Sequence, residues 1–300
     1  MRLTIIFLIN VFALAAIVRA ADDAPPAPTK PVKHRIMFFE YGSGGNRLVE
    51  LDADGKLTWE HKPLSIAVIF QPLENGNVVY AYGGSPTGVV EINRDQKQVW
   101  NYVSKCPQVL GLHRLASGNT LIGEQGPAAA VEVDPKGAVV KTTPLTTSHQ
   151  HFHQQVRNVI KLKSGNILAG HEGEGAIREV DADGKLVWEH KGITNALAML
   201  RLENGNTLIG CGTQKRLIEV TPKGETVWEF GEKDGPELNL TWISSVQVLK
   251  NGNIVAGNFL RGSEGKGAHA FEVTREKKVV WTFADHKFKS ITTIRVLDDR

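Results

Sequence analysis

Leu202-Glu-Asn-Gly-Asn206 is the stretch that decides the fold of this chain. It lies between two apolar runs, 196–202 and 207–211. Asn-Gly between such runs favours a tight hairpin, because both residues tolerate positive φ. Four related stretches are spread along the chain: Leu73-Glu-Asn-Gly-Asn77, Leu115-Ala-Ser-Gly-Asn119, Leu162-Lys-Ser-Gly-Asn166 and Leu249-Lys-Asn-Gly-Asn253. The hairpin therefore belongs to a repeat of about forty residues, a period typical of solenoids, propellers and arrays.

A second element recurs in each unit, namely an alternating strand, a polar turn and a strand that, in all units but the third, ends in Trp. It reads VELDADGKLTWE at 49–60 and REVDADGKLVWE at 178–189. The recurring tryptophans are Trp59, Trp100, Trp188, Trp228 and Trp281, and Lys141 stands at the equivalent place in the third unit. Because a buried indole on the outer strand can pack against the next unit, we expect a weak contact beside the third unit.

Each unit holds four short strands, and no segment after the first twenty residues keeps a helical period. Four antiparallel strands per unit describe a propeller blade. Residues 291–297 resemble the innermost strand of each unit, and the first unit, which begins at 36–41, lacks that strand. We therefore predict an all-β, six-bladed β-propeller of four-stranded antiparallel blades, closed by pairing of the C-terminal strand (291–297) with the N-terminal blade.

Residues 1–20 have the pattern of a signal peptide, with Arg2, an apolar run at 3–18 and small residues before Ala21. A membrane anchor is the alternative, for which the apolar run is short. The proline-rich residues 21–33 are predicted to form an extended tether, and 34–300 the propeller. These features predict a secreted or periplasmic protein with no membrane span after signal cleavage.

The charge balance excludes one class of partner. The chain has 35 Lys and Arg against 32 Asp and Glu, with no basic stripe, so nucleic acid is not predicted as a partner. Cys106 and Cys211 fall in different repeats, and we expect both to be free.

A glutamate recurs in the third strand of every unit: Glu50, Glu91, Glu132, Glu179, Glu219 and Glu272. Six carboxylates could suggest a metal ring. The third strand lies away from the axis, however, because strands are spaced by about 4.8 Å. We therefore expect each glutamate to bond local backbone or a polar group of a neighbouring blade.

Most of the histidines are predicted to gather at one end of the ring, in links between blades or in loops between second and third strands: His61, His149, His151, His153, His171, His190, His269 and His286. In the segment 148–155, alternation puts His149, His151 and His153 on one side if the backbone is extended. The ends of second strands should bring Glu124, His171 and Cys211 near them. His113 lies in an innermost strand, facing either the channel or the packed flank.

These residue types suit several chemistries. The candidates for catalysis are His113, His151, His153 and Arg157, since imidazoles transfer protons near neutral pH and arginine binds anions. A divalent transition metal is possible, with His151, His153 and His171 as ligands. The ligand-binding candidates are Tyr82, Glu124, His171, Cys211, Trp242 and Asn258. Tyr82, Trp242 and Phe259 could stack on a sugar or an aromatic ring. The alternative is a set of surface histidines around a water-filled channel.

The Leu-x-x-Gly-Asn and Asp-x-x-Gly-Lys-x-x-Trp elements make residues 34–300 resemble secreted bacterial six-bladed propellers with quinoprotein-like or arylsulfotransferase-like repeats, among them uncharacterised members. Quinoprotein dehydrogenases use eight blades and an adjacent Cys pair, which this chain lacks, so PQQ is not expected as a cofactor. Arylsulfotransferases use a channel histidine that carries sulfate. Here His113, His151, His153, His171 and Arg157 supply the residue types without the surrounding motif.

We therefore predict an exported β-propeller binding protein, whose ligand or partner binds at the His-rich mouth of the central channel. The ligand would be a small molecule, a glycan or an anion, or else a protein partner. One alternative is an arylsulfotransferase-like or hydrolytic enzyme that uses a channel histidine. The other is a metal-binding propeller.

Overall fold

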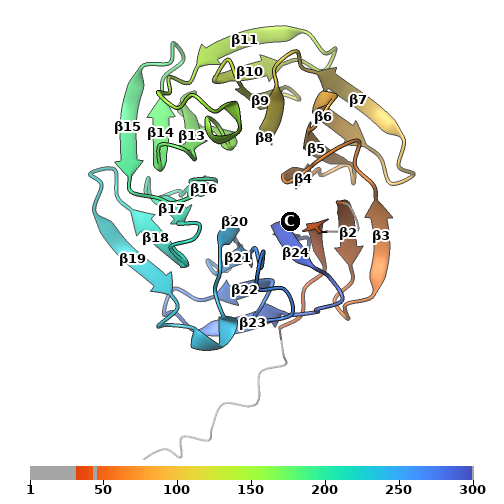
Figure 1. The fold of residues 1–300 in the computed structure, drawn as a ribbon, viewed down its shortest axis with the longest axis vertical. Helices are drawn as coiled ribbons and strands as arrows, with labels where there is room; N and C mark the ends of the chain where they lie inside the picture. Colours follow the sequence, from red (N-terminus) through yellow and green to blue (C-terminus); the bar gives the residue numbers. More distant parts are fainter. Residues whose placement is uncertain (1–31, 43–45, 299–300) are drawn as a thin grey trace, which may run out of the picture. The chain divides into compact units, whose positions relative to one another are not determined.

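The computed structural model describes residues 32–42 and 46–298, and these form a six-bladed β-propeller (Figure 1). Every blade is a four-stranded antiparallel sheet, as predicted. From the channel outward, blade 1 contains β24 (Ser290–Val296), β1 (Ile36–Tyr41), β2 (Arg47–Leu51) and β3 (Leu57–His61). Blade 2 contains β4 (Phe70–Pro72), β5 (Val78–Gly83), β6 (Thr87–Ile92) and β7 (Gln98–Val103). Blade 3 contains β8 (Gln108–Arg114), β9 (Thr120–Gln125), β10 (Ala129–Val133) and β11 (Val139–Pro144).

The other three blades follow in the same order. Blade 4 contains β12 (Asn158–Lys161), β13 (Ile167–His171), β14 (Ala176–Val180) and β15 (Leu186–Lys191). Blade 5 contains β16 (Ala198–Arg201), β17 (Thr207–Gly210), β18 (Arg216–Val220) and β19 (Thr226–Gly231). Blade 6 contains β20 (Ile243–Val248), β21 (Ile254–Asn258), β22 (Ala270–Val273) and β23 (Val279–Phe283). Two short 3-10 helices, η1 (Phe152–Gln154) and η2 (Pro236–Leu238), lie in links between blades.

Blade 1 joins the two ends of the propeller. β24 pairs antiparallel with β1, with Ile36 opposite Val296 and Tyr41 opposite Ser290. In Figure 1 the blue β24 lies beside the orange strands of the same blade. The predicted closure of the ring is therefore confirmed, and it leaves β1 paired on both sides.

The predicted signal peptide, 1–20, and residues 21–31 of the predicted tether lie outside the described residues. Within the described part, no helix is long and apolar enough to cross a bilayer.

The repeated motif has a specific structural role. The turn glycines, such as Gly205, adopt positive φ, so that the hairpin closes between the first and second strands. The asparagine that follows points outward along the blade, and Asn206 Nδ2 donates to Glu219 Oε1 at 2.6 Å. The same bond joins Asn77 to Glu91, Asn119 to Glu132, Asn166 to Glu179 and Asn253 to Glu272. Glycine makes the turn and asparagine ties it to the third strand.

The third-strand glutamates also join the blades to one another. Arg201 of blade 5 pairs with Glu179 of blade 4 at 2.6 Å and covers the Trp188 ring. The same three residue types meet at three other junctions, where Arg114 also ends an innermost strand but Arg94 and Arg275 lie in the turn before an outermost strand: Arg94, Glu50 and Trp59; Arg114, Glu91 and Trp100; and Arg275, Glu219 and Trp228. The expectation that these glutamates bond neighbouring polar groups is confirmed.

Two junctions depart from this pattern. Between blades 3 and 4, Lys161 replaces the arginine at 3.6 Å from Glu132, and Lys141 stands where the indole would be. Between blades 6 and 1, His34 Nε2 lies 2.7 Å from Glu272 Oε2 and its ring contacts Trp281 edge to face.

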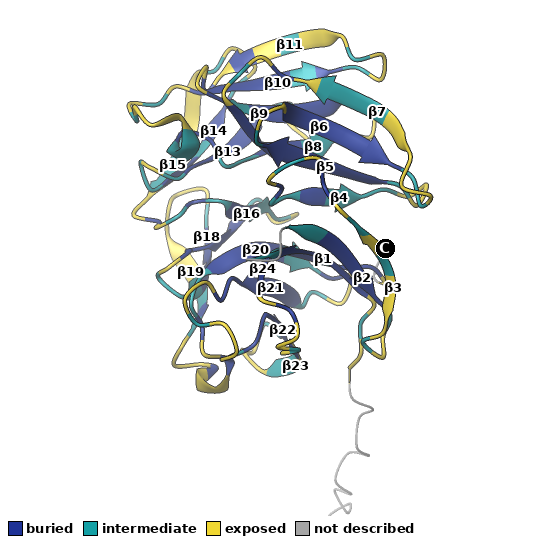
Figure 2. Cartoon of the chain, turned by 45° about the vertical axis from the view of Figure 1, so that its right-hand side comes forward, coloured by how far each residue is buried: buried dark blue, intermediate teal, exposed yellow. Residues whose placement is uncertain are grey.

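The second and third strands of a blade are more buried than its outermost strand, as Figure 2 shows for β5, β6 and β7. The apolar side chains of the inner strands pack between blades in six clusters rather than in one central core. These clusters therefore do not fill the central axis of the ring, where a cavity lies.

Candidate functional site

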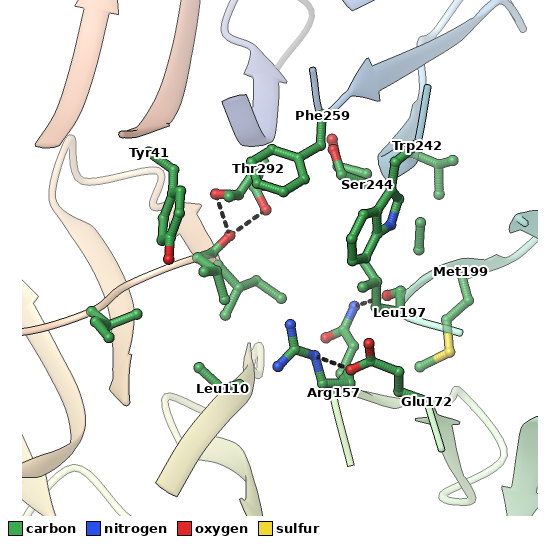
Figure 3. Close-up of a pocket in the computed structure, with 18 of the residues that line it drawn as sticks. Tyr41, Leu110, Arg157, Glu172, Leu197, Met199, Trp242, Ser244, Phe259 and Thr292 are labelled. Carbon is green, nitrogen blue, oxygen red and sulfur yellow. Dashed lines mark hydrogen bonds and ion pairs between the residues drawn. The ribbon is translucent and has the colours of Figure 1, made fainter. Parts of the chain in front are cut away.

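A cavity of about 360 Å³ opens at one end of the channel (Figure 3). Its walls come from the starts of the innermost strands, the links that precede them and the loops after second strands. This is the end of the ring where the sequence places most histidines. All six blades contribute to it through innermost strands, or links and loops beside them.

One side of the cavity is aromatic. Phe259, after β21, contacts Tyr41 at the end of β1 with ring centroids 5.8 Å apart, and Trp242 with centroids 5.5 Å apart. Both contacts are edge to face, an arrangement that aromatic rings prefer and that holds all three in place. Figure 3 shows these rings along the side of the cavity opposite Arg157. The aromatic wall therefore consists of Tyr41, Trp242 and Phe259.

Asn258 explains why Trp242 sits there. Its side chain is fully buried, and its Oδ1 accepts hydrogen bonds from the backbone N–H groups of Thr241 at 2.8 Å and Trp242 at 3.2 Å. Its Nδ2 donates to the carbonyl of Ala268 at 2.8 Å. Asn258 therefore fixes the link before β20 and does not itself line the cavity.

The facing side is a polar network. Arg157 Nε lies 2.9 Å from Glu172 Oε2, and its Nη1 lies 3.1 Å from His153 Nε2. His153 Nδ1 lies 2.6 Å from Gln108 Oε1. Asn195 Nδ2 donates to the other oxygen of Glu172 at 2.9 Å. Four groups thereby hold one guanidinium in position.

The partners of His153 define its protonation state. Arg157 can only donate, so Nε2 of His153 must be an acceptor, and the proton is assigned to Nδ1, which donates to Gln108. Burial lowers the pKa of His153, and the charge of Arg157 lowers it further. Burial also lowers the pKa of Arg157, which Glu172 opposes. The network thus contains a neutral imidazole and an ion pair, with Arg157 pre-oriented.

Of the site residues expected from the sequence, the cavity is lined by His153, Arg157, Trp242 and Phe259. His151 is exposed beside Phe152. The segment 148–155 is not extended, because η1 turns it, so His149, His151 and His153 do not share one side. His113 lies on the packed flank, where its Nδ1 accepts from the backbone N–H of Lys161 at 3.0 Å.

Of the remaining candidates, Tyr82, Cys211 and His171 are buried and Glu124 is half-buried. The Tyr82 hydroxyl donates to Asn101 at 3.0 Å, and Glu124 accepts from Tyr102 and Ser104. Cys211 lies in an apolar cluster, where burial raises the pKa of its thiol to about 12. His171 is fully buried, with Nδ1 3.8 Å from Glu174. None of these four residues lines the cavity.

The three proposed metal ligands are not brought together. The rings of His151 and His153 are 6.3 Å apart, and His171 lies outside the cavity. Among the described residues, no group of three or more His, Cys, Asp and Glu side chains could hold a metal ion. His153 has no free ring nitrogen for one. These residues therefore do not fit a metal site.

Several lining residues were missed from the sequence, notably Tyr41, Gln108, Glu172 and Arg295. Glu172 directly follows His171 at the end of a second strand. Since Glu124 was expected near the channel mouth because it ends a second strand, the same signal predicts Glu172. Arg295 is a charge in an otherwise uncharged closing strand, which is also a readable signal.

Comparison with known proteins gives the family. The model of the Mal s 1 allergenic protein-like family matches residues 87–282, about two thirds of the chain. This chain belongs to that family. Within the Mal s 1-like chain, the matched part runs from β6 to β23 and so includes blades 3 to 6. The match does not confirm the resemblance to quinoprotein-like or arylsulfotransferase-like repeats.

Solved structures similar to this Mal s 1-like chain share its fold. A protein of unknown function from Bacteroides caccae is 25% identical, with a TM-score of 0.78 over 88% of this chain and 98% of that one. Catalytically inactive virginiamycin B lyase from Staphylococcus aureus with quinupristin is 12% identical, with a TM-score of 0.57 over 85% and 86% of the two chains. At that identity the likeness shows the fold alone. No curated protein matches the sequence.

Proposed function

We propose that this chain is a binding protein that takes a small organic molecule into the cavity at the channel mouth. The observation that supports this best is the aromatic wall facing the fixed Arg157–Glu172 pair. Ligand pockets commonly have about 300–1,000 Å³, mostly apolar walls and a few placed polar groups, and this cavity has all three features. Export to the periplasm or the medium is part of the same proposal.

The walls indicate the shape of the ligand. A flat, apolar part, such as an aromatic ring or the face of a sugar, would pack on Trp242 and Tyr41. A polar part would reach Arg157 and Glu172 on the other side. Leu110 and Met199 add further apolar surface to the cavity wall.

A binding role suits the histidine of this site better than catalysis does. Both ring nitrogens of His153 are engaged by Gln108 and Arg157, so neither is free to attack a substrate or to take its proton. His153 instead orients Arg157.

The test is a ligand screen on matched variants. Thermal shift with a panel of aromatic carboxylates, their amides, and disaccharides should find compounds that raise the melting temperature of the wild type. Trp242→Ala should weaken the binding of these compounds about 10- to 30-fold, because it removes a large stacking surface. Val187→Ala, on the exposed outer strand of blade 4, is the control and should bind like the wild type. Equal binding to all three proteins would contradict the proposal.

A further inference from the structure

Arg295 occupies a special place in the innermost strand of blade 1. It lies two residues before Leu297. In each of the other blades, the equivalent residue lies two positions before the leucine of the hairpin motif. Those equivalents are Gln71, His113, Ile160, Leu200 and Gln247. None of them is acidic, and burial lowers the pKa of His113, which keeps this ring of positions free of other charge.

The polar equivalents join neighbouring blades. The Gln247 side chain accepts from the backbone N–H of Val296 at 2.9 Å and donates to its carbonyl at 3.2 Å. Gln71 makes the same pair of bonds with Arg114. At these positions the side chain therefore links the inner strand to the next inner strand.

Arg295 breaks this pattern. Its Nη1 donates to the carbonyls of Ile294 at 2.8 Å and Val246 at 3.5 Å. Its Nε and Nη2 have no acceptor among residues 32–42 and 46–298. Arg295 is one of the residues that line the cavity.

No carboxylate of the described residues compensates this charge. Burial alone lowers the pKa of Arg295 to about 10, and no acidic group contributes to the shift. The charged side chains of the cavity wall are Arg157, Glu172, Arg261 and Arg295, so the wall has a net positive charge, and its one acid pairs with Arg157. Arg295 is half-buried and stays charged at neutral pH, so its charge is available to an anion in the cavity.

Ser245 is a further lining residue and bonds the residue that precedes Arg295. Its Oγ accepts from the backbone N–H of Ile294 at 3.2 Å, so its own proton remains to be donated. The hydroxyls of Thr292 and Thr293, by contrast, donate to the carbonyl of Val68 at 3.1 and 2.6 Å.

We propose that Arg295, assisted by Ser245, is the anion-binding group of this cavity and takes the carboxylate of a small aromatic acid. This rests on the proposed function, since the aromatic wall would hold the ring of the same ligand. Nε and Nη2 together present the two parallel N–H groups that match a carboxylate. Arg157 is already paired with Glu172, so we assign it to the polar part of the ligand and not to its carboxylate.

The first experiment compares indole-3-acetate with its neutral amide by titration calorimetry. The wild type should bind the acid at least tenfold more tightly than the amide. Arg295→Met should reduce this preference to less than twofold and leave amide binding unchanged. Arg261→Met, a change at an exposed arginine of the same wall, should retain the preference. A preference that persists in Arg295→Met, or that is absent from the wild type, would overturn the proposal.

The second experiment separates this proposal from the proposed function. Wild-type crystals soaked in bromide should show an anomalous peak beside Nε and Nη2 of Arg295, even if neither indole compound binds. A peak with no indole binding would support the anion site and count against the proposed aromatic ligand. No peak at Arg295 would overturn the anion site, whether or not the amide binds.

Discussion

Arg201 and Glu179 belong to neighbouring blades and form an ion pair of 2.6 Å, with their side chains only 19% and 11% exposed. Breaking a buried pair leaves one charge without its partner, which costs about 3 kcal/mol. We therefore expect Glu179→Ala to lower the free energy of unfolding by about that amount, as measured by urea denaturation.

The same junction offers a matched control. Lys163 and Glu203 also join blades 4 and 5, at 2.8 Å, but their side chains are 86% and 87% exposed. An exposed pair contributes at most about 1 kcal/mol, so Glu203→Ala should have a much smaller effect. Equal losses in the two variants would show that the triads do not stabilise the ring.

Substitutions at the junction between blades 3 and 4 should strengthen the contact between these two blades. Lys161 and Lys141 stand where other junctions have arginine and tryptophan. The double variant Lys141→Trp, Lys161→Arg would restore an arginine over an indole, which contributes about 0.5–1 kcal/mol. A double-mutant cycle of unfolding free energies should therefore give a favourable coupling energy. Strictly additive effects would contradict the assignment of Lys141 to the tryptophan position.

His171 predicts a loss of stability in acid. Burial, with help from the charge of Arg178, lowers its pKa from 6.5 to about 4 in the folded protein. Between these values the unfolded chain binds a proton that the folded chain does not, so stability falls as the pH is lowered through this window. Between pH 6.5 and pH 4, the titration of His171 should lower the free energy of unfolding by about 3 kcal/mol.

The measurement is the free energy of unfolding between pH 4 and 7. His171→Gln should flatten its dependence on pH relative to the wild type. His151→Gln, which changes an exposed histidine, should keep the wild-type slope. An unchanged slope in His171→Gln would refute the prediction.

The closing strand supports a fourth prediction. Ile294 is buried opposite Phe38, where β24 meets β1. Ile294→Ala should lower the free energy of unfolding by about 3 kcal/mol, because it leaves a cavity in the closing blade. Hydrogen exchange should accelerate most in β1 and β24. The control is Leu168→Ala in blade 4, at an equally buried position. In this variant, hydrogen exchange in β1 should not accelerate more than exchange in the other strands.

The fold could be predicted from the sequence because it depends on local, repeated chemistry. The Leu-x-x-Gly-Asn stretches, such as 202–206, each close a hairpin through a glycine of positive φ, and the recurring Trp marks the outer strands of all blades except blade 3. Closure of the ring could also be predicted, since residues 291–297 match an innermost strand that the first unit lacks.

The site was less accessible to sequence reasoning. Side-chain direction in the link 148–155 depends on η1, whose short turn has no clear sequence signal. The role of His113 depends on a backbone N–H that is 48 residues away. Arg157 was identified as an anion-binding candidate, but its partner Glu172 comes from another element, so their pairing appeared only in the folded structure.

β24 is both the last strand of the ring and part of the wall that holds Arg295. A chain cut before this strand would lose Thr292, Thr293 and Arg295 at once, so on the proposed function a clipped molecule could not bind ligand. Bound ligand should in turn protect β24 from proteolysis, which makes resistance to cleavage in this strand a direct report of ligand binding.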